Sequence, residues 1–237
     1  MGERFPHASV TKVASAIAVL VVVEAGRCAL DDEVGPPGAT LAHLLSHASG
    51  LPTDGATPIA APGTRRIYSN TGIEIAVAHA AAASRATPTE LVTSRVFEPL
   101  GMRETALTGS AASGAIGPTE DLCALAAELL LPTLLSPQLA ATQRTVAYPG
   151  LVGVLPGFGR QVPCDWGLGL EVKGSKRPHW TGETWPSSTV GHFGQSGGFV
   201  VADVEAGIAI VTLGDERFGT WSTSAWPAFT DAVRASH

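Results

Sequence analysis

Several residue types are scarce in this sequence, and each shortage argues against a class of protein. Its 237 residues include three cysteines (Cys28, Cys123 and Cys164), an odd number without Cys-x-x-Cys spacing. That argues against a disulfide framework or a thiolate zinc site and fits a reducing compartment. The apolar run from Val13 to Val23 is too short for a bilayer, which needs roughly 20 residues, so we expect no membrane span.

Charge is scarce as well. Charged residues make up 15% of the chain, the net charge is −6, and the basic residues are scattered, which argues against a nucleic-acid partner. The first residues, Met1 to Arg4, lack the pattern of a cleavable signal, so the expected location is cytoplasmic as the chain stands. A hydrophobic content of 45% provides ample material for a core, and a single domain over residues 1–237 is expected.

The order of the predicted elements indicates an α+β protein. Residues from about 9 to 140 are expected to be mainly helical, and residues from about 160 to 237 to form a sheet and a C-terminal helix. Residues 142–165 are rich in glycine and proline and are expected to be irregular. The expected helices cover about 9–26, 40–47, 73–83, 87–97, 119–131 and 223–235, and the expected strands lie within 166–172, 190–203 and 207–213.

The first helix carries a serine and a lysine that are suited to nucleophilic chemistry. Ser9 and Lys12 stand at i and i+3, so both side chains leave the same face of the first turn. A serine hydroxyl needs a base to take its proton. Burial favours the neutral amine of a lysine, which could serve as that base. In an isolated Ser-x-x-Lys, Ser9 would merely cap the helix, but lysine is scarce here and Lys12 opens an otherwise apolar helix.

A second candidate lies at a loop-to-helix junction, where Tyr68, Ser69 and Asn70 follow one another. Ordinary capping by Ser69 or Asn70 would explain this tripeptide. In the functional interpretation Tyr68 points at Ser9 and Lys12. Cations nearby, Lys12 and either Arg65 or Arg66, would then favour its phenolate as a base.

A third candidate lies on a late strand, where His192, Phe193 and Gly194 precede Gln195. Ser-x-x-Lys, Tyr-Ser-Asn and His-x-Gly in this order resemble the serine β-lactamase/penicillin-binding family, in particular its branch of class C β-lactamases and family VIII-type esterases. The segments Leu44–Pro52 and Pro99–Met102 look like further stretches of that family. The resemblance covers nearly the whole chain.

The resemblance implies a β-lactamase/transpeptidase-like fold, with a helical lobe packed on an antiparallel sheet and the site in the cleft between them. Ser9 would be the acylated nucleophile, Lys12 its activating partner and Tyr68 the general base or acid. Asn70 would position substrate, and His192 stands where the family often has lysine. Backbone N–H groups of Ser9 and Gln195 would form the oxyanion hole. No cofactor and no metal ion are implied.

Two departures from the family pattern change the expectation. The chain begins eight residues before Ser9, so the family's N-terminal strands are expected to be missing. An unpaired sheet edge is costly unless something covers it, for example a second copy in a homo-oligomer. Phe193 stands where the family usually has a threonine, serine or small residue. Loss of that hydroxyl, which commonly binds a substrate carboxylate, favours an uncharged acyl substrate such as a small ester.

Two other patterns in the sequence suggest different sites. Gly194 to Gly198 fits the Gly-x-Ser-x-Gly elbow of α/β-hydrolases with Ser196 as nucleophile, but the terminal His237 is the one histidine that follows. His43 and His47 have the i, i+4 spacing of a helical metal pair, without a third ligand.

The expected activity is therefore that of a serine hydrolase acting on small esters or amides through an acyl-enzyme. The alternatives are a true β-lactamase or D-Ala carboxypeptidase, whose substrate would be a β-lactam or peptide, and a catalytically impaired member that binds a ligand or partner.

Overall fold

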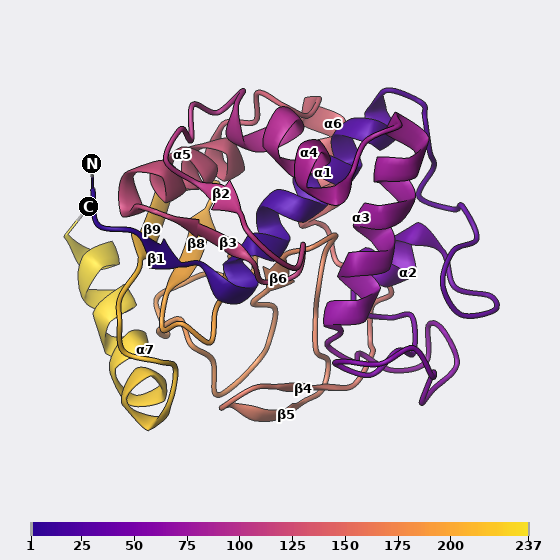
Figure 1. Ribbon diagram of the computed structural model, residues 1–237. Coiled ribbons are helices and arrows are strands. Elements are labelled where there is room, and N and C mark those ends of the chain that lie inside the picture. Colours follow the sequence, from indigo (N-terminus) through magenta and orange to yellow (C-terminus); the bar gives the residue numbers. More distant parts are fainter. Residues whose placement is uncertain (1, 237) are drawn as a thin grey trace.

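The computed structural model describes residues 2–236, and helix α1 (Thr11–Glu24) lies at its centre. Figure 1 shows α1 between α3 (Asn70–Ser84) on one side and the strands β8 (Phe199–Asp203) and β9 (Ile208–Thr212) on the other. Helices pack on an antiparallel sheet, as expected. No helix within residues 2–236 combines the length and apolar character needed to cross a membrane.

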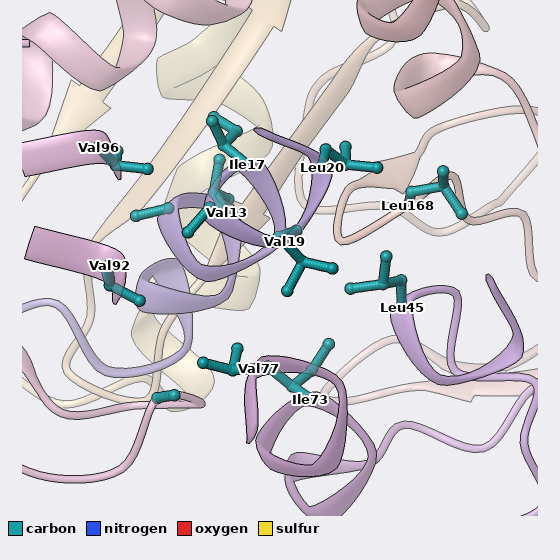
Figure 2. Close-up of a cluster of buried hydrophobic side chains, with 14 of the residues drawn as sticks. Val13, Ile17, Val19, Leu20, Leu45, Ile73, Val77, Val92, Val96 and Leu168 are labelled. Carbon is teal, nitrogen blue, oxygen red and sulfur yellow. The ribbon is translucent and has the colours of Figure 1, made fainter. Parts of the chain in front are cut away.

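Helix α1 is buried around nearly its whole circumference because its sequence is apolar on every face. Figure 2 shows its side chains surrounded by those of four other segments. Ile73 and Val77 reach it from α3, and Val92 and Val96 reach it from the helical segments within residues 88–97. Leu45 lies at the end of a short helix, and Leu168 lies in a turn. A short 3₁₀ turn, η1 (Ala8–Val10), precedes α1 and places Ser9 at the end of this core.

The remaining helices begin where the sequence provides capping residues. Thr40 caps α2 (Leu41–Leu45), and Ser69 caps α3 through the N–H of Gly72. Thr87 and Glu90 form a reciprocal capping box at α4 (Pro88–Val92). The other helical segments are η2 (Thr93–Phe97), α5 (Thr119–Leu130), α6 (Pro137–Arg144) and α7 (Thr220–Ala235).

The main sheet has four antiparallel strands in the order β6-β7-β8-β9. They are β6 (Glu171–Val172), β7 (Val190–Phe193), β8 (Phe199–Asp203) and β9 (Ile208–Thr212). Helix α5 packs on β8 and β9, and Trp226 of α7 packs with Phe199 and Phe193 in a second, aromatic cluster. Within residues 2–236, β9 pairs with β8 alone, so its other edge has no strand beside it.

Two smaller sheets complete the fold. Strands β1 (Phe5–Pro6), β3 (Ala115–Gly117) and β2 (Ala106–Leu107) form one of them. Strands β4 (Gly153–Leu155) and β5 (Gly159–Gln161) form a hairpin in the other.

Two expectations were wrong in detail. Residues 166–170 were expected in a strand but form a turn closed by the N–H of Gly167 and the carbonyl of Leu170. Residues 142–165, expected to be irregular, contain the end of α6 and the β4–β5 hairpin, whose three-residue strands are too short to show an alternating pattern.

The turn at Gly169 determines how closely the sheet lobe approaches α1. Its φ is +75°, and a Cβ at this position would lie 2.1 Å from the Cβ of Ala16. We predict that Gly169→Ala lowers the free energy of unfolding by about 2–4 kcal/mol, because a left-handed conformation and an overpacked core both add cost. Urea denaturation measures this value.

The matched control is Gly207→Ala in the β8–β9 turn, where φ is +68° and no atom lies within 4 Å of the added Cβ. This variant should lose about 1 kcal/mol, from the conformation alone. Equal losses in the two variants would contradict the packing argument.

Candidate active site

The sequence-predicted residues meet at a cleft of about 430 Å³. Segments from both lobes line it: η1, the residues leading into α3, the β4–β5 hairpin and the end of β7. Ser9, Tyr68, Asn70, His192, Phe193 and Gln195 all contribute to its wall. Lys12 lies behind Ser9 and is fully buried.

The amine of Lys12 is positioned to exchange a proton with Ser9. Its Nζ lies 3.1 Å from Ser9 Oγ and 2.8 Å from the carbonyl oxygen of Ala112. Burial lowers the pKa of Lys12 from 10.5 to about 7, although the carboxylates of Glu74 and Asp54 act in the opposite direction. A neutral amine is therefore available near neutral pH, and it donates a hydrogen bond to the carbonyl oxygen of Ala112.

The phenol of Tyr68 lies over the same pair. Lys12 Nζ is 4.7 Å from the centre of the Tyr68 ring. Burial raises the pKa of Tyr68 above its usual value near 10, and a hydrogen bond with Ser9 only partly opposes this. The neutral phenol is thus favoured, contrary to the expected phenolate.

The cations invoked for that phenolate do not supply the required charge. The pKa of Lys12 is itself lowered, so its charge is weakened where the phenolate would need it. The Arg66 guanidinium is buried and donates to the backbone carbonyls of Ser46, Cys164, Ala147 and Tyr148. Arg65 is exposed at the wall of the cleft.

His192 presents a neutral imidazole to the site. Its Nδ1 lies 2.7 Å from the carbonyl of Phe193, so Nδ1 carries the proton and donates it. Burial lowers the pKa of His192 to about 3, with the charge of Lys12 acting in the same direction. Its Nε2 is buried without a hydrogen-bond partner among the described residues and therefore offers a lone pair. A cationic lysine of the family's strand motif is not reproduced here.

Two backbone N–H groups at the cleft are candidates for an oxyanion hole. Ser9 precedes the first hydrogen bond of η1, which Val10 N donates to the carbonyl of His7, so the N–H of Ser9 is left without an intrahelical acceptor. Gln195 lies just after β7 and lines the cleft beside Ser9. Gly194 permits this approach, because a Cβ there would lie 2.7 Å from the carbonyl oxygen of His7.

Asn70 and Phe193 occupy the wall in different ways. Asn70 donates from Nδ2 to Asp54 Oδ1 over 3.0 Å, while its buried Oδ1 has no partner in the described structure. Phe193 is 7% exposed and stacks on Phe218 with ring centres 4.9 Å apart. Since neighbouring residues of a strand face opposite sides, Phe193 belongs to the aromatic cluster under α7 and reaches the cleft at its margin.

Several residues of the site had not been predicted. Trp166 lies edge-on to His192, with ring centres 5.4 Å apart, and lines the cleft. The carbonyl of Ala112 reaches Lys12 from 100 residues away in the sequence. Arg160 enters from β5. Nothing local in the sequence marks these positions, because each depends on a long-range contact.

The rival serine is placed in a turn. Ser196 lies between β7 and β8, where Gly194 N donates to the carbonyl of Gly198, so the strand-turn-helix geometry of an elbow is absent from residues 190–203. His237, considered as its base, lies outside the described residues.

Two groups could be considered as metal ligands. His47 lies beyond the end of α2 at φ +58°, so His43 and His47 do not share a helical face. Away from the cleft, Cys28, Asp32 and His79 place one ligand atom each within 4.8 Å of one another. Burial raises the pKa of the Cys28 thiol to about 11, which favours the protonated form that does not bind metal.

A serine with a buried amine behind it, at a cleft between helices and an antiparallel sheet, is the arrangement of acyl-transferring serine enzymes. The family model described as Beta-lactamase matches residues 1–222, and the chain belongs to that family. A β-lactamase from Mycobacterium bovis is 47% identical, with a TM-score of 0.97 over 99% of this chain and 88% of that one.

More distant structures share the fold. A hydrolase with promiscuous acyltransferase activity, EstCE1, is 18% identical and has a TM-score of 0.77 over 98% of this chain and 85% of that one. An octameric penicillin-binding protein homologue from Pyrococcus abyssi is 20% identical, with a TM-score of 0.77 over 99% of this chain and 66% of that one. No curated protein matches the chain.

The lowered pKa of Lys12 predicts that this residue costs stability in a pH-dependent way. The folded state binds the Lys12 proton more weakly than the unfolded state does, so the cost grows as pH falls from 10.5 and is complete below about 7. At pH 6 it amounts to roughly 5 kcal/mol at most. Lys12→Met should therefore be more stable than the unmodified protein at pH 6, and the difference should shrink by pH 9.5.

Urea denaturation at pH 6, 8 and 9.5 tests this expectation. Arg103→Met, at an exposed position, is the control and should show no change with pH. A Lys12→Met protein that is less stable at pH 6 than at pH 9.5, relative to the unmodified chain, would contradict it.

Proposed function

We propose that the protein is a serine hydrolase that cleaves small esters or amides through an acyl-enzyme on Ser9. The observation that carries this proposal is the pair of Ser9 Oγ and the fully buried Lys12 Nζ, 3.1 Å apart, with the pKa of Lys12 lowered to about 7. The nucleophile and its base are thus within hydrogen-bond distance before substrate arrives.

In the first half of the proposed reaction, the neutral amine of Lys12 takes the proton of Ser9 while Oγ attacks the acyl carbon. The developing oxyanion accepts hydrogen bonds from the N–H groups of Ser9 and Gln195. When the bond to the leaving group breaks, the leaving oxygen or nitrogen must receive a proton. The neutral phenol of Tyr68, which lies beside Lys12, is the proposed donor, and it regains its proton from the Lys12 ammonium.

In the second half, water attacks the acyl-Ser9 carbonyl, and its proton passes to the Lys12–Tyr68 pair. Ser9 Oγ leaves with a proton, and the free acid departs. The buried lone pair on His192 Nε2 is proposed to accept a hydrogen bond at this side of the site. Asn70, whose Oδ1 is unpartnered, is proposed to hold the substrate.

The preference for esters or amides rests on the end of β7. The neutral His192 and the apolar Phe193 together offer no cation and no hydroxyl to a carboxylate placed beside the reacting carbonyl. The solved structures with this fold include EstCE1, a hydrolase with promiscuous acyltransferase activity, and a D-stereospecific amidohydrolase.

β-Lactam hydrolysis is the second candidate, favoured by the 47% identity to the β-lactamase from Mycobacterium bovis. A catalytically impaired binding protein is a third, and acylation by a serine-reactive probe distinguishes it. The free edge of β9 is proposed to be covered in a homo-oligomer, and an octameric homologue exists among the proteins with this fold.

The assignment of the nucleophile is tested by Ser9→Ala. Turnover of short p-nitrophenyl esters should fall to the uncatalysed background, and a fluorophosphonate probe should no longer add mass to the protein. Ser196→Ala is the matched control and should retain both turnover and labelling. Activity that survives in Ser9→Ala and disappears in Ser196→Ala would overturn the assignment.

The substrate preference predicts a larger kcat/KM for p-nitrophenyl butyrate than for benzylpenicillin. A carboxylate that loses a charge-assisted hydrogen bond loses roughly 1.5–3 kcal/mol, or about tenfold to a hundredfold in kcat/KM. Parallel steady-state assays measure the ratio. Efficient hydrolysis of benzylpenicillin with ester turnover no better would show that the protein is instead a β-lactamase.

A further inference from the structure

The cleft differs in charge from the rest of the molecule. The chain carries a net charge of −6, yet the described residues that line the cleft include three arginines (Arg65, Arg66 and Arg160) and neither aspartate nor glutamate. A concave surface of one sign concentrates ligands of the opposite sign. The wall therefore favours an anionic ligand, although β7 offers no group to bind an anion.

Two of the three guanidinium groups are free to bind such a ligand. Arg66 is buried, and its donors are used by backbone carbonyls. Arg65 and Arg160 are exposed, and no hydrogen bond or ion pair joins either guanidinium to another described residue. Arg177, which is also exposed, instead pairs with Glu183 over 2.7 Å.

The backbone brings these two arginines to the same hairpin. Arg160 lies directly opposite Val154 in the β4–β5 pair. Arg66 forms a parallel bridge to Gly153, so the neighbouring Arg65 runs beside β4. Both arginines therefore belong to segments that run along the β4–β5 side of the cleft.

The surface near these arginines is apolar. Ile59 and Val154 line the cleft and are each 62% exposed, and Leu155 and Pro156 continue the same wall. Large exposed apolar side chains at a cleft mark a surface that a ligand covers. A ligand that lies on this wall would place an apolar chain between Ser9 and the two arginines.

We propose that the substrate carries a carboxylate at the end of a short apolar chain and that Arg65 and Arg160 bind this carboxylate. The inference rests on the proposed function, because it names the substrate class of the same site. The carboxylate is remote from the reacting carbonyl, so the lack of a hydroxyl at Phe193 does not exclude it.

Two matched pairs of esters test the proposal. In the first pair, mono-p-nitrophenyl adipate, whose acyl group carries the carboxylate, is compared with the neutral p-nitrophenyl methyl adipate. In the second pair, 4-acetoxybenzoate, whose leaving group carries the carboxylate, is compared with its neutral methyl ester. The anionic member of at least one pair should have a kcat/KM about three- to tenfold higher, since exposed ion pairs contribute modestly. The preference for the anionic ester should decrease when the salt concentration is raised from 50 mM to 500 mM, because salt screens exposed charges.

The variants Arg65→Gln and Arg160→Gln, alone and together, should lower the anionic ester's kcat/KM and leave that of its neutral partner unchanged. Arg217→Gln removes the same charge from an exposed position outside the cleft and should leave both unchanged. No preference in either pair, or a preference that survives in the double variant, overturns the inference.

A binding measurement separates this inference from the proposed function. In the Ser9→Ala protein, calorimetry should show tighter binding of the anionic ester than of its methyl ester, and the Arg65→Gln/Arg160→Gln double variant should lose the difference. Equal turnover of both esters by the unmodified protein contradicts the inference alone. Preferential binding without any Ser9-dependent turnover supports the arginine site and contradicts the proposed reaction.

Discussion

The burial of one amine is the constraint on which the site depends. Lys12 opens a helix that is apolar on all sides, so its Nζ contacts no carboxylate within residues 2–236 and meets a hydroxyl, a carbonyl and an aromatic face. Such an environment favours the uncharged amine. The same core that makes α1 stable thus determines the protonation state of the group behind Ser9.

The rest of the site follows from that neutral amine. A protonated lysine would have favoured a phenolate at Tyr68, whereas burial keeps the phenol neutral. His192 is neutral as well, so among the described residues the two basic side chains nearest Ser9, Lys12 and His192, both have lowered pKa values. The arginines that line the cleft belong instead to the hairpin and to the segment before α3.

What could be predicted from the sequence depended on how local each feature is. The Ser9–Lys12 pair follows from helical spacing, and Thr40, Ser69 and Thr87 mark helix starts through their own side chains. The meeting of Ser9, Tyr68 and His192 came from the family resemblance, because they lie on separate elements. The protonation state of Tyr68 was predicted wrongly, since it depends on burial that no motif encodes. The β4–β5 hairpin escaped prediction because strands of three residues show no period.

Arg66 has a consequence for the shape of the cleft. Its guanidinium donates to carbonyls at residues 46, 147, 148 and 164. These residues come from segments far apart in the sequence, and all of them lie outside the helices and strands. In these segments one side chain does what a β-ladder does elsewhere, satisfying acceptors and fixing spacing. Together with backbone hydrogen bonds such as that from Ala147 N to the carbonyl of Trp166, Arg66 joins segments on this side of the cleft, and a lysine could not reproduce its planar set of donors.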